Sequence, residues 1–358
     1  MKIIQVLTTI AFGDAVSNDT LAIRDILRDL GYETGIYAEH IDERLPAGTA
    51  QVVASLPELN GDDVIIYHAS TGTQLNFDLP KLPGRKLMIY HNITPPEFFE
   101  GYSPAAVQLT HLGYEGMRFL ADKTEYCIAD SEYNRQDLLK LGYTCPIDVC
   151  PILIPFEDYD RKPDPKVINR YKGDGWTNLL FVGRIAPNKK QQDVIRAFYC
   201  YQRDYNPKSR LFLVGSAGGM EKYESQLHAY VQLLGIGDKV IFPGHIKFDA
   251  ILAYYRLADV FVCMSEHEGF CVPLVEAMYF DTPIVAYRSS AIPDTMGEGG
   301  LLLEDKDPHM AAAVIDRVVR DRTLREWILV HQREKLQEYQ YETVSRRLKD
   351  CLNRIIKN

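Results

Sequence analysis

The chain alternates short apolar runs with segments of helical periodicity, and this alternation limits the folds open to it. In the first half the apolar runs are Ile3–Thr8, Thr34–Ala38, Val64–His68, Lys86–His91, Tyr126–Asp130 and Val149–Ile154. In the second half they are Leu179–Val182, Leu211–Val214, Val240–Phe242, Val260–Met264 and Ile284–Ala286. Strands that alternate with helices form βαβ units and parallel sheets. The sequence therefore predicts two α/β domains in succession.

Length and linker composition indicate how the chain is divided. At 358 residues it exceeds the size at which a single hydrophobic core stops growing, so two domains are expected. Prolines and charges interrupt all periodicity between Pro151 and Pro165, which predicts a linker there. We predict domains at residues 1–156 and 166–338, followed by a C-terminal helix at 339–358. That helix has one apolar face, which must pack against another element. The face consists of Val344, Leu348, Leu352 and Ile355.

Composition excludes some classes of protein. The formal net charge of −9 argues against general nucleic-acid binding, which basic surfaces drive. The seven cysteines form no Cys-x-x-Cys pair, so we expect reduced and mostly buried thiols, as in cytoplasmic proteins. No stretch contains the roughly 18 uninterrupted apolar residues that span a bilayer. We therefore expect a cytoplasmic protein with at most peripheral contact at the inner face of the membrane.

The first motif that carries chemistry opens the second half of the chain. The segment Phe181–Lys189, FVGRIAPNK, indicates a strand, a loop and the approach to a helix that begins near Gln191. In parallel α/β sheets, ligands bind beyond the carboxyl ends of strands, and helix N-termini there favour anions. Gly183 lets the backbone approach a ligand, while Arg184 and Lys189 are two cations that could bind a diphosphate. The alternative is that both are solvated basic residues on a surface loop.

The second motif follows another predicted strand and has the sequence SEHEGFCVPLVEAM, residues 265–278. Its loop carries Glu268, Gly269 opens free backbone amides, and a helix from about Val272 carries Glu276. The amides suit phosphate or sugar oxygens, and an ionised carboxylate can accept two hydrogen bonds from a vicinal diol. The alternative is that the two glutamates only complement the helix dipole.

Together, the two motifs resemble a known enzyme family. Gly183-Arg184 with Lys189, followed by Glu268-x7-Glu276 within EGFxxPxxEAM, is similar to the retaining GT-B glycosyltransferases of the group 1 (family 4) class. The resemblance covers essentially the whole chain. It implies two Rossmann-like domains that face a central cleft, with the C-terminal helix crossing back to the first domain.

The resemblance also implies roles for individual residues in the C-terminal domain, which would hold most of the nucleotide-sugar donor. Arg184 and Lys189 would bind the diphosphate, and Glu276 would bind the ribose. Glu268 and the backbone amides of residues 269–271 would meet the transferred sugar. The donor-binding positions implied here are Gly183, Arg184, Lys189, Glu268, Gly269, Phe270, Cys271 and Glu276.

In the N-terminal half, the resemblance points to two further positions. Gly13 lies in the loop after the first apolar run, where the family has a glycine loop near the donor phosphates; many relatives have two adjacent glycines there and this chain has one. His91 ends a predicted strand, like the family's histidine that faces the donor sugar. The alternative is a histidine that is hydrogen-bonded inside a loop. We expect Ser131 to cap a helix rather than line the acceptor side, and the segment Ser290–Asp294 departs from the glycine pair and Pro-Glu of many relatives.

The implied function is a retaining transfer of a hexose, mannose-like or glucose-like. The donor would be a nucleoside-diphosphate sugar such as GDP-mannose or a UDP-hexose, and the acceptor a hydroxyl of a glycan or lipid-linked acceptor. The implied route is front-face and needs no metal: the leaving diphosphate helps to deprotonate the acceptor while Arg184, Lys189 and a helix N-terminus stabilise charge. His91 and Glu268 complete the predicted catalytic set, His91 by orienting the sugar rather than acting as the base.

Other functions remain open from the sequence. A sugar-nucleotide epimerase of GT-B fold would share the diphosphate-binding groups, and a non-catalytic GT-B subunit would bind a partner protein. The Asp158-Tyr159-Asp160 segment resembles the Asp-x-Asp pair that binds a metal in GT-A transferases, but it runs into the charged linker. No Gly-x-Ser-x-Gly segment supports a serine hydrolase. The motifs do not encode the donor base, the acceptor or the oligomeric state.

Overall fold

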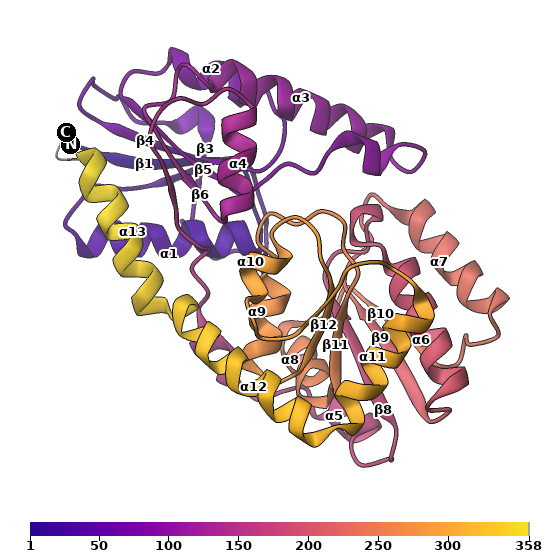
Figure 1. Cartoon of the computed structure of the whole chain (residues 1–358). Coiled ribbons are helices and arrows are strands. Elements are labelled where there is room, and N and C mark those ends of the chain that lie inside the picture. Colours follow the sequence, from indigo (N-terminus) through magenta and orange to yellow (C-terminus); the bar gives the residue numbers. More distant parts are fainter. Residues whose placement is uncertain (357–358) are drawn as a thin grey trace. The chain divides into compact units, whose positions relative to one another are not determined.

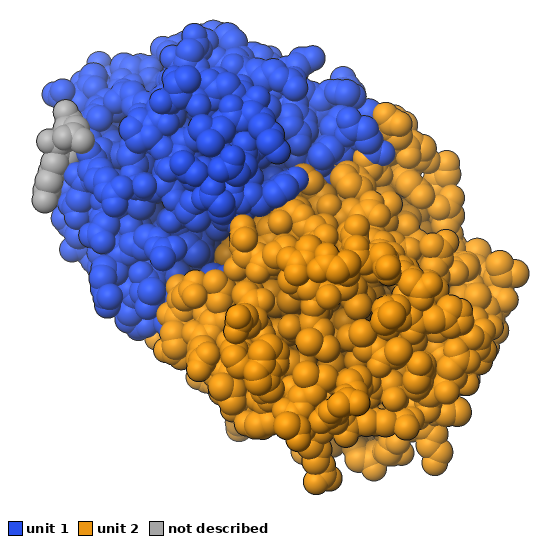
Figure 2. Space-filling view, in the orientation of Figure 1, with its two compact units in different colours: residues 1–97, 105–155, 339–358 blue, residues 98–104, 156–338 orange. Residues whose placement is uncertain are grey.

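The computed structural model describes residues 1–356 and contains two compact units, coloured separately in Figure 2. Of the described residues, unit 1 comprises 1–97, 105–155 and 339–356, and unit 2 comprises 98–104 and 156–338. Residues 357 and 358 of the predicted C-terminal helix lie outside the described residues. Among residues 1–356, no helix has the length and apolar character that crossing a membrane requires.

Unit 1, which includes the indigo to magenta part of the ribbon in Figure 1, contains a parallel sheet. Its seven strands have the order β3-β2-β1-β4-β5-β6-β7. The order reverses between β1 and β4, and ligands bind such sheets beyond the carboxyl ends of the strands at that point. The central strands are mostly apolar because helices cover both faces of the sheet. The strands are β1 (Ile3–Ile10), β2 (Ile36–Ile41), β3 (Gln51–Val52), β4 (Val64–Ala69), β5 (Arg85–Tyr90), β6 (Tyr126–Ala129) and β7 (Ile147–Val149).

Alternate residues of β4 belong to two cores, one on each face of the unit 1 sheet. Ile65 and Tyr67 pack in a cluster with side chains of α3 and α4. Val64 and Ile66 pack in another with side chains of α1 and α13, so α13 covers the same face as α1. The helices of this unit are α1 (Ala15–Asp29), α2 (Leu75–Asp78), α3 (Pro104–Leu120), α4 (Glu132–Lys140) and α13 (Tyr341–Ile356).

Unit 2 contains a six-stranded parallel sheet with the strand order β10-β9-β8-β11-β12-β13, which reverses between β8 and β11. The strands are β8 (Thr177–Val182), β9 (Ser209–Val214), β10 (Val240–Gly244), β11 (Val260–Cys263), β12 (Ile284–Tyr287) and β13 (Leu301–Leu303). The helices are α5 (Pro165–Tyr171), α6 (Gln191–Asp204), α7 (Glu221–Leu233), α8 (Phe248–Leu257), α9 (Val272–Tyr279), α10 (Ile292–Met296), α11 (Pro308–Arg320) and α12 (Arg322–Leu336).

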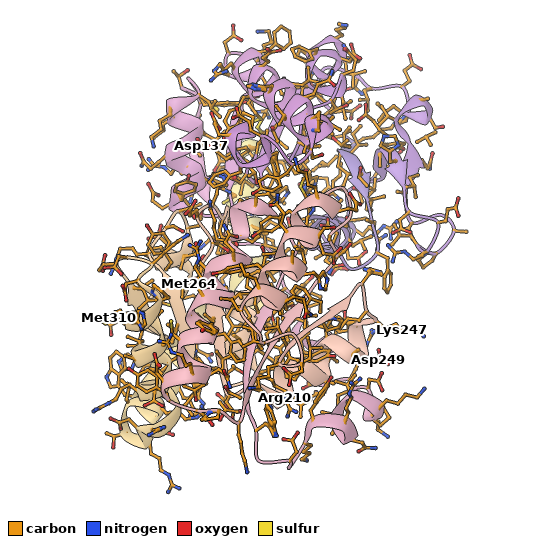
Figure 3. All side chains as sticks on the ribbon, turned by 90° about the vertical axis from the view of Figure 1, so that its right-hand side faces the viewer. Asp137, Arg210, Lys247, Asp249, Met264 and Met310 are labelled. Atoms are coloured by element: carbon orange, nitrogen blue, oxygen red, sulfur yellow. The ribbon has the colours of Figure 1, made fainter. Side chains whose placement is uncertain are left out.

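A buried arginine holds the amino-terminal edge of the unit 2 sheet. Arg210 on β9, labelled in Figure 3, donates from Nη1 to Asp174 Oδ2 over 2.7 Å and from Nε to Asn178 Oδ1 over 2.6 Å. The guanidinium therefore has charged and polar acceptors despite its burial, as a buried cation requires. It fixes the start of β9 against the residues that lead into β8.

The expectation of two α/β domains with parallel sheets is confirmed. Ser131 caps α4 as predicted, because its side chain accepts from the Asn134 amide over 3.1 Å. The strand predicted at Val149–Ile154 is wrong for most of its length: β7 ends at Val149, and the residues beyond it, flanked by the prolines at 151 and 155, form a buried loop. The short strands β3 and β13 were not predicted because two or three residues give no periodicity.

Candidate active site

Both sequence motifs lie at the same edge of the unit 2 sheet. One follows β8 and leads to α6, and the other follows β11 and leads to α9. These two strands are neighbours and are the pair at which the strand order reverses. In open parallel sheets, ligands bind beyond the carboxyl ends of such strands. Both helices begin at the predicted residues, Gln191 and Val272.

An ion pair joins the two motifs across 79 sequence positions. Lys189 Nζ donates to Glu268 Oε2 over 2.5 Å, and the side chains are 21% and 7% exposed. Burial lowers the pKa of Lys189, but the charge and hydrogen bond of Glu268, together with the nearby Cys271 and Cys263, raise that pKa above its ordinary value. Lys189 is therefore an ammonium ion at neutral pH.

A glycine-rich loop after β9 supports the first motif, and the sequence reasoning missed it. A Cβ atom on Gly215 would lie 1.9 Å from the Gly183 carbonyl oxygen, so the two loops meet backbone to backbone. The exposed Arg184 donates from Nη2 to the Gly218 carbonyl over 3.0 Å. The signal was present in the sequence GSAGG, residues 215–219, directly after a predicted strand.

The second motif makes a tight turn before α9. Cys271 precedes the helix with a φ of 76°, which is uncommon for a residue other than glycine. The amide of Glu268 donates to Ser290 Oγ over 2.8 Å, so the segment that departs from the family pattern supports this turn. Phe270 and Cys271 are buried and Gly269 is partly exposed. Any ligand contact of the two buried residues would come from their backbone.

Glu276 lies on α9, and a tyrosine hydroxyl donates to each of its carboxylate oxygens. Tyr159 donates to Oε1 over 2.9 Å, and Tyr255 donates to Oε2 over 2.6 Å. Burial raises the pKa of Glu276 above its ordinary value, and the two tyrosine hydrogen bonds oppose that rise. A carboxylate has about four lone-pair sites, so about two remain for a ligand. The motif itself gave no sign of the tyrosines, which come from the linker and from α8.

Gly13, the predicted glycine of unit 1, lies in the exposed turn between β1 and α1. Its φ is 76°, and no atom lies within 4 Å of the position a Cβ would take. The backbone conformation, rather than the space available, is what favours glycine here. The next residue, Asp14, caps α1, because its Oδ2 accepts from both the amide and the hydroxyl of Ser17 over 3.0 Å.

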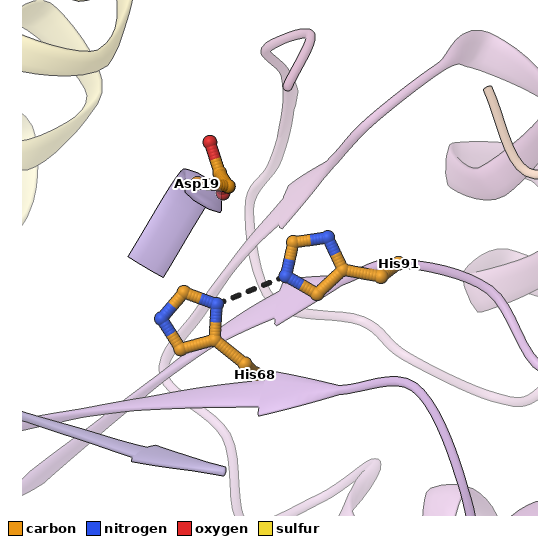
Figure 4. Close-up of side chains that lie close together, drawn as sticks. All are labelled: Asp19, His68 and His91. Carbon is orange, nitrogen blue, oxygen red and sulfur yellow. Dashed lines mark hydrogen bonds between the residues drawn. The ribbon is translucent and has the colours of Figure 1, made fainter. Parts of the chain in front are cut away.

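His91 directly follows β5, and its side chain is 1% exposed. Its Nδ1 is 2.9 Å from Asp130 Oδ2, and its Nε2 is 2.9 Å from His68 Nδ1 (Figure 4). The ring therefore corresponds to the alternative of a histidine hydrogen-bonded inside the fold, and it could contact a sugar only after one of these bonds is broken. The sequence reasoning missed Asp130, His68 and the nearby Asp19.

Among the described residues, two groups bring possible metal ligands within 4.8 Å of one another. One lies in unit 1 and one in unit 2, where the Lys189 ammonium already balances the glutamate. The groups are Asp19, His68 and His91, and Cys263, Glu268 and Cys271.

Asp158 and Asp160 are the acidic pair that resembles the metal-binding Asp-x-Asp of GT-A transferases. Each of them contacts another side chain of the protein. Asp158 forms an ion pair with Arg161 at 2.5 Å. Asp160 accepts a hydrogen bond from the Tyr279 hydroxyl over 2.7 Å. The Asp160 bond thus ties the linker segment to α9, while the Asp158 ion pair lies within the linker itself.

Comparison with known proteins identifies the family to which this domain is similar. The family described as "Glycosyl transferases group 1" matches residues 167–343. The D-inositol 3-phosphate glycosyltransferase of Acidothermus cellulolyticus is 33% identical over 147 residues, which cover 39% of this chain and 33% of that protein. The O-antigen chain mannosyltransferase B of Escherichia coli is 24% identical over 213 residues, which cover 57% of this chain and 54% of that protein. The chain thus spans about a third to a half of the length of such relatives.

Solved structures resemble the whole chain. Sucrose-phosphate synthase from Thermosynechococcus elongatus has a TM-score of 0.77 at 16% identity and covers 100% of both chains. Anabaena Alr3699/HepE in complex with UDP-glucose has a TM-score of 0.75 at 18% identity, over 99% of this chain and 100% of that one. Two Rossmann-like sheets with these matches define a GT-B protein. Within that class, the matched domain makes the chain a member of the group 1 glycosyltransferases.

Proposed function

We propose that the chain is a retaining glycosyltransferase that moves a hexose, mannose-like or glucose-like, from a nucleoside-diphosphate sugar to a hydroxyl of a glycan or lipid-linked acceptor. One observation carries the proposal: the motifs after β8 and β11 meet where the strand order of unit 2 reverses, and the Lys189–Glu268 ion pair joins them. An ammonium ion beside the turn that leads into α9 suits the diphosphate of such a donor.

Each predicted residue has a task in this proposal. Arg184 and Lys189 bind the diphosphate, and the amides of residues 269–271 with Glu268 hold the transferred sugar. The two remaining acceptor sites of Glu276 bind the ribose hydroxyls. Support for the last assignment is that Tyr159 and Tyr255 leave part of the carboxylate unsatisfied. Gly13 and His91 of unit 1 stay predicted donor contacts.

The bond changes follow from the retained configuration. The bond between the anomeric carbon and the diphosphate oxygen breaks, and the acceptor oxygen bonds to the same face of that carbon. The acceptor proton moves to the departing diphosphate. Arg184 and Lys189 stabilise the negative charge that develops on the leaving group. No metal takes part in this route.

The proposal also covers the donor base and the cellular location of the protein, and two alternative functions must be tested against it. HepE was crystallised with UDP-glucose and one relative is named a mannosyltransferase, so UDP-glucose and GDP-mannose are the first donors to test. The seven cysteines carry free thiols, which supports the cytoplasm, with at most peripheral contact at the inner membrane face. An epimerase would convert the donor without an acceptor, and a non-catalytic subunit would convert nothing.

The experiment is a thermal-shift panel of GDP, UDP, ADP and their sugar conjugates in the presence of EDTA. A nucleotide at about 100 times its dissociation constant stabilises the folded state by about 2.7 kcal/mol if it binds only that state. We expect one base to stabilise the wild type and to lose most of its effect in Glu276→Gln. Glu334→Gln, an exposed carboxylate on α12, is the matched control and should respond like the wild type.

Turnover is then measured with the donor so identified. Lys189→Ala and Arg184→Ala should each lower kcat by about 100-fold or more, since each removes a charge that stabilises the leaving group. Undiminished turnover in both variants would exclude the proposed mechanism. Donor conversion without acceptor would identify an epimerase, and nucleotide stabilisation that appears only with added divalent metal would exclude the metal-free route.

A further inference from the structure

A series of buried polar side chains crosses the unit 1 sheet. Asp130 Oδ2 is 2.9 Å from His91 Nδ1, His91 Nε2 is 2.9 Å from His68 Nδ1, and His68 Nε2 is 2.9 Å from Gln5 Oε1. Gln5 lies on β1 and His68 on β4, and His91 and Asp130 directly follow β5 and β6, so the four come from adjacent strands. Asp19 of α1 lies beside the two rings (Figure 4).

The geometry between the two rings fits a shared proton rather than a metal ion. The rings are coplanar to within 1°, and their facing nitrogens are 2.9 Å apart. A tetrahedral zinc ion, with bonds of about 2.0–2.1 Å, holds two nitrogen ligands about 3.4 Å apart with both lone pairs aimed at a third point. An in-plane N–H···N hydrogen bond explains both observations without any movement of the rings.

Asp130 and Gln5 are the acceptors at the two ends of this hydrogen-bonded series of side chains, and they set the direction of the bonds between them. The Asp130 carboxylate only accepts, so His91 donates from Nδ1. The Gln5 carbonyl oxygen faces His68 Nε2, and with this orientation of the Gln5 amide His68 donates from Nε2 and keeps a lone pair on Nδ1. His91 must then donate from Nε2 as well, and a ring that donates from both nitrogens is an imidazolium cation.

The charges around the ring agree with this direction. Asp19 and Asp130 are buried carboxyl groups, and among residues 1–356 no lysine or arginine pairs with either. An imidazolium is therefore the nearest available cation. Burial lowers the pKa of His91, but Asp130 foremost, then Asp19 and Asp14 of α1, raise it above its ordinary value. The pKa of His68 is well below its ordinary value, through burial and the charge on His91.

We propose that His91 is a fixed imidazolium in the working enzyme, with Asp130, His68 and Gln5 as the positioning residues that keep it doubly protonated. This inference rests on the proposed function and assigns the charge state of one of its residues. An imidazolium has no lone pair, so His91 cannot take the acceptor proton, which must leave with the diphosphate. Its positive charge instead lies at the end of β5.

The first test reads the charge directly and needs no activity. The full chain is labelled with 15N-histidine, and imidazole nitrogen NMR is recorded between about pH 6 and pH 8. The His91 signal, identified by its loss in His91→Gln, should show two protonated nitrogens. In Asp130→Asn the His91 ring should lose one proton within this range. A singly protonated His91 at a pH where the wild type is active would overturn the proposal.

The second test uses the pH profile of kcat/KM, because the two possible roles of His91 have opposite signs. A required imidazolium makes activity fall as the pH rises past the His91 pKa, whereas a general base makes it rise. Asp130→Asn should move the falling limb at least about one unit lower, which is about tenfold less activity at a fixed pH on that limb. The matched control, exposed Asp62→Asn, should keep the wild-type limb.

The two tests separate this inference from the proposed function. Activity that rises with pH through the His91 titration, or an Asp130→Asn limb that coincides with the wild type, would overturn the imidazolium role while leaving the transferase intact. If no nucleotide sugar is turned over, the proposed function fails, and the NMR titration still decides whether His91 is charged.

Discussion

At the scale of single residues, Asp19 is a buried carboxyl group that pairs with no lysine or arginine among residues 1–356. Burial raises its pKa to about 7, although the charge on His91 opposes the rise. The folded state then binds this proton more tightly than the unfolded state, whose aspartate titrates near pH 4. The unfolding free energy must therefore fall as the pH rises from about 4 to about 7, and the loss persists above that range.

Asp19→Asn should remove this penalty. Its side-chain oxygen can still accept from the Leu153 amide, which donates to Asp19 Oδ1 over 2.9 Å. We expect the variant to be more stable than the wild type at pH 8 by about 2–4 kcal/mol and to show a flatter pH dependence between pH 4 and 7. Urea unfolding across that range measures both quantities. The prediction would be contradicted if the unfolding free energy of the variant depended on pH as steeply as that of the wild type, or if the variant were less stable than the wild type at pH 8.

The residues that sequence reasoning could and could not find differ in a physical way. Lys189 and Glu268 were found because each stands in a local pattern after a strand, and parallel topology brings such loops to one edge. Tyr159 and Tyr255 were not found, since only tertiary packing brings them to Glu276. For the same reason the hydrogen-bond partners of His91 could not be predicted. They come from other strands of the sheet, and no fixed sequence spacing separates them from His91.

At the scale of elements, apolar runs predicted nearly every strand, because a parallel sheet covered on both faces needs continuous apolar segments. Elements of two or three residues, such as β3 and β13, carry too little pattern to be found. The loop after β9 is a different case. Its glycines can be read from the sequence, but the reason for glycine at residue 215 cannot. Gly215 packs closely against Gly183, and Gly183 belongs to another loop.

Replacement of this glycine should disturb the first motif. In Gly215→Ala the new Cβ would lie 1.9 Å from the Gly183 carbonyl oxygen, and the residue has a φ of 157°, so the loop that carries Arg184 must shift. We expect a loss of at least about tenfold in nucleotide affinity by calorimetry and a lower melting temperature.

The same loop provides the control. Gly218→Ala brings its Cβ only to 3.5 Å from the Ser216 hydroxyl, which is ordinary contact, and should bind nucleotide like the wild type. Equal affinities of the Gly215 and Gly218 variants would show that the backbone contact does not support the site.

At the scale of the whole molecule, the end of the chain completes the core of unit 1 rather than that of unit 2. The apolar face of α13 packs in one cluster with side chains of β1, β4, β5 and α1, and α12 belongs to unit 2. Leu348 is 2% exposed at the centre of this face. A substitution that weakens the packing of α13 should therefore destabilise β4 in unit 1 and leave β8 in unit 2 unaffected.

Leu348→Ala should destabilise unit 1 by about 2–4 kcal/mol, the usual effect of removing a buried leucine side chain. Hydrogen exchange followed by mass spectrometry can resolve peptides from β4 and from β8 in the same sample. We expect faster exchange in the β4 peptides alone, and a nucleotide that binds unit 2 should still slow exchange in the β8 peptides. Arg347→Ala, an exposed neighbour on α13, should leave both sets unchanged. Equal acceleration of exchange in β4 and β8 would mean instead that the two units unfold as a single cooperative body, with the C-terminal helix stabilising both.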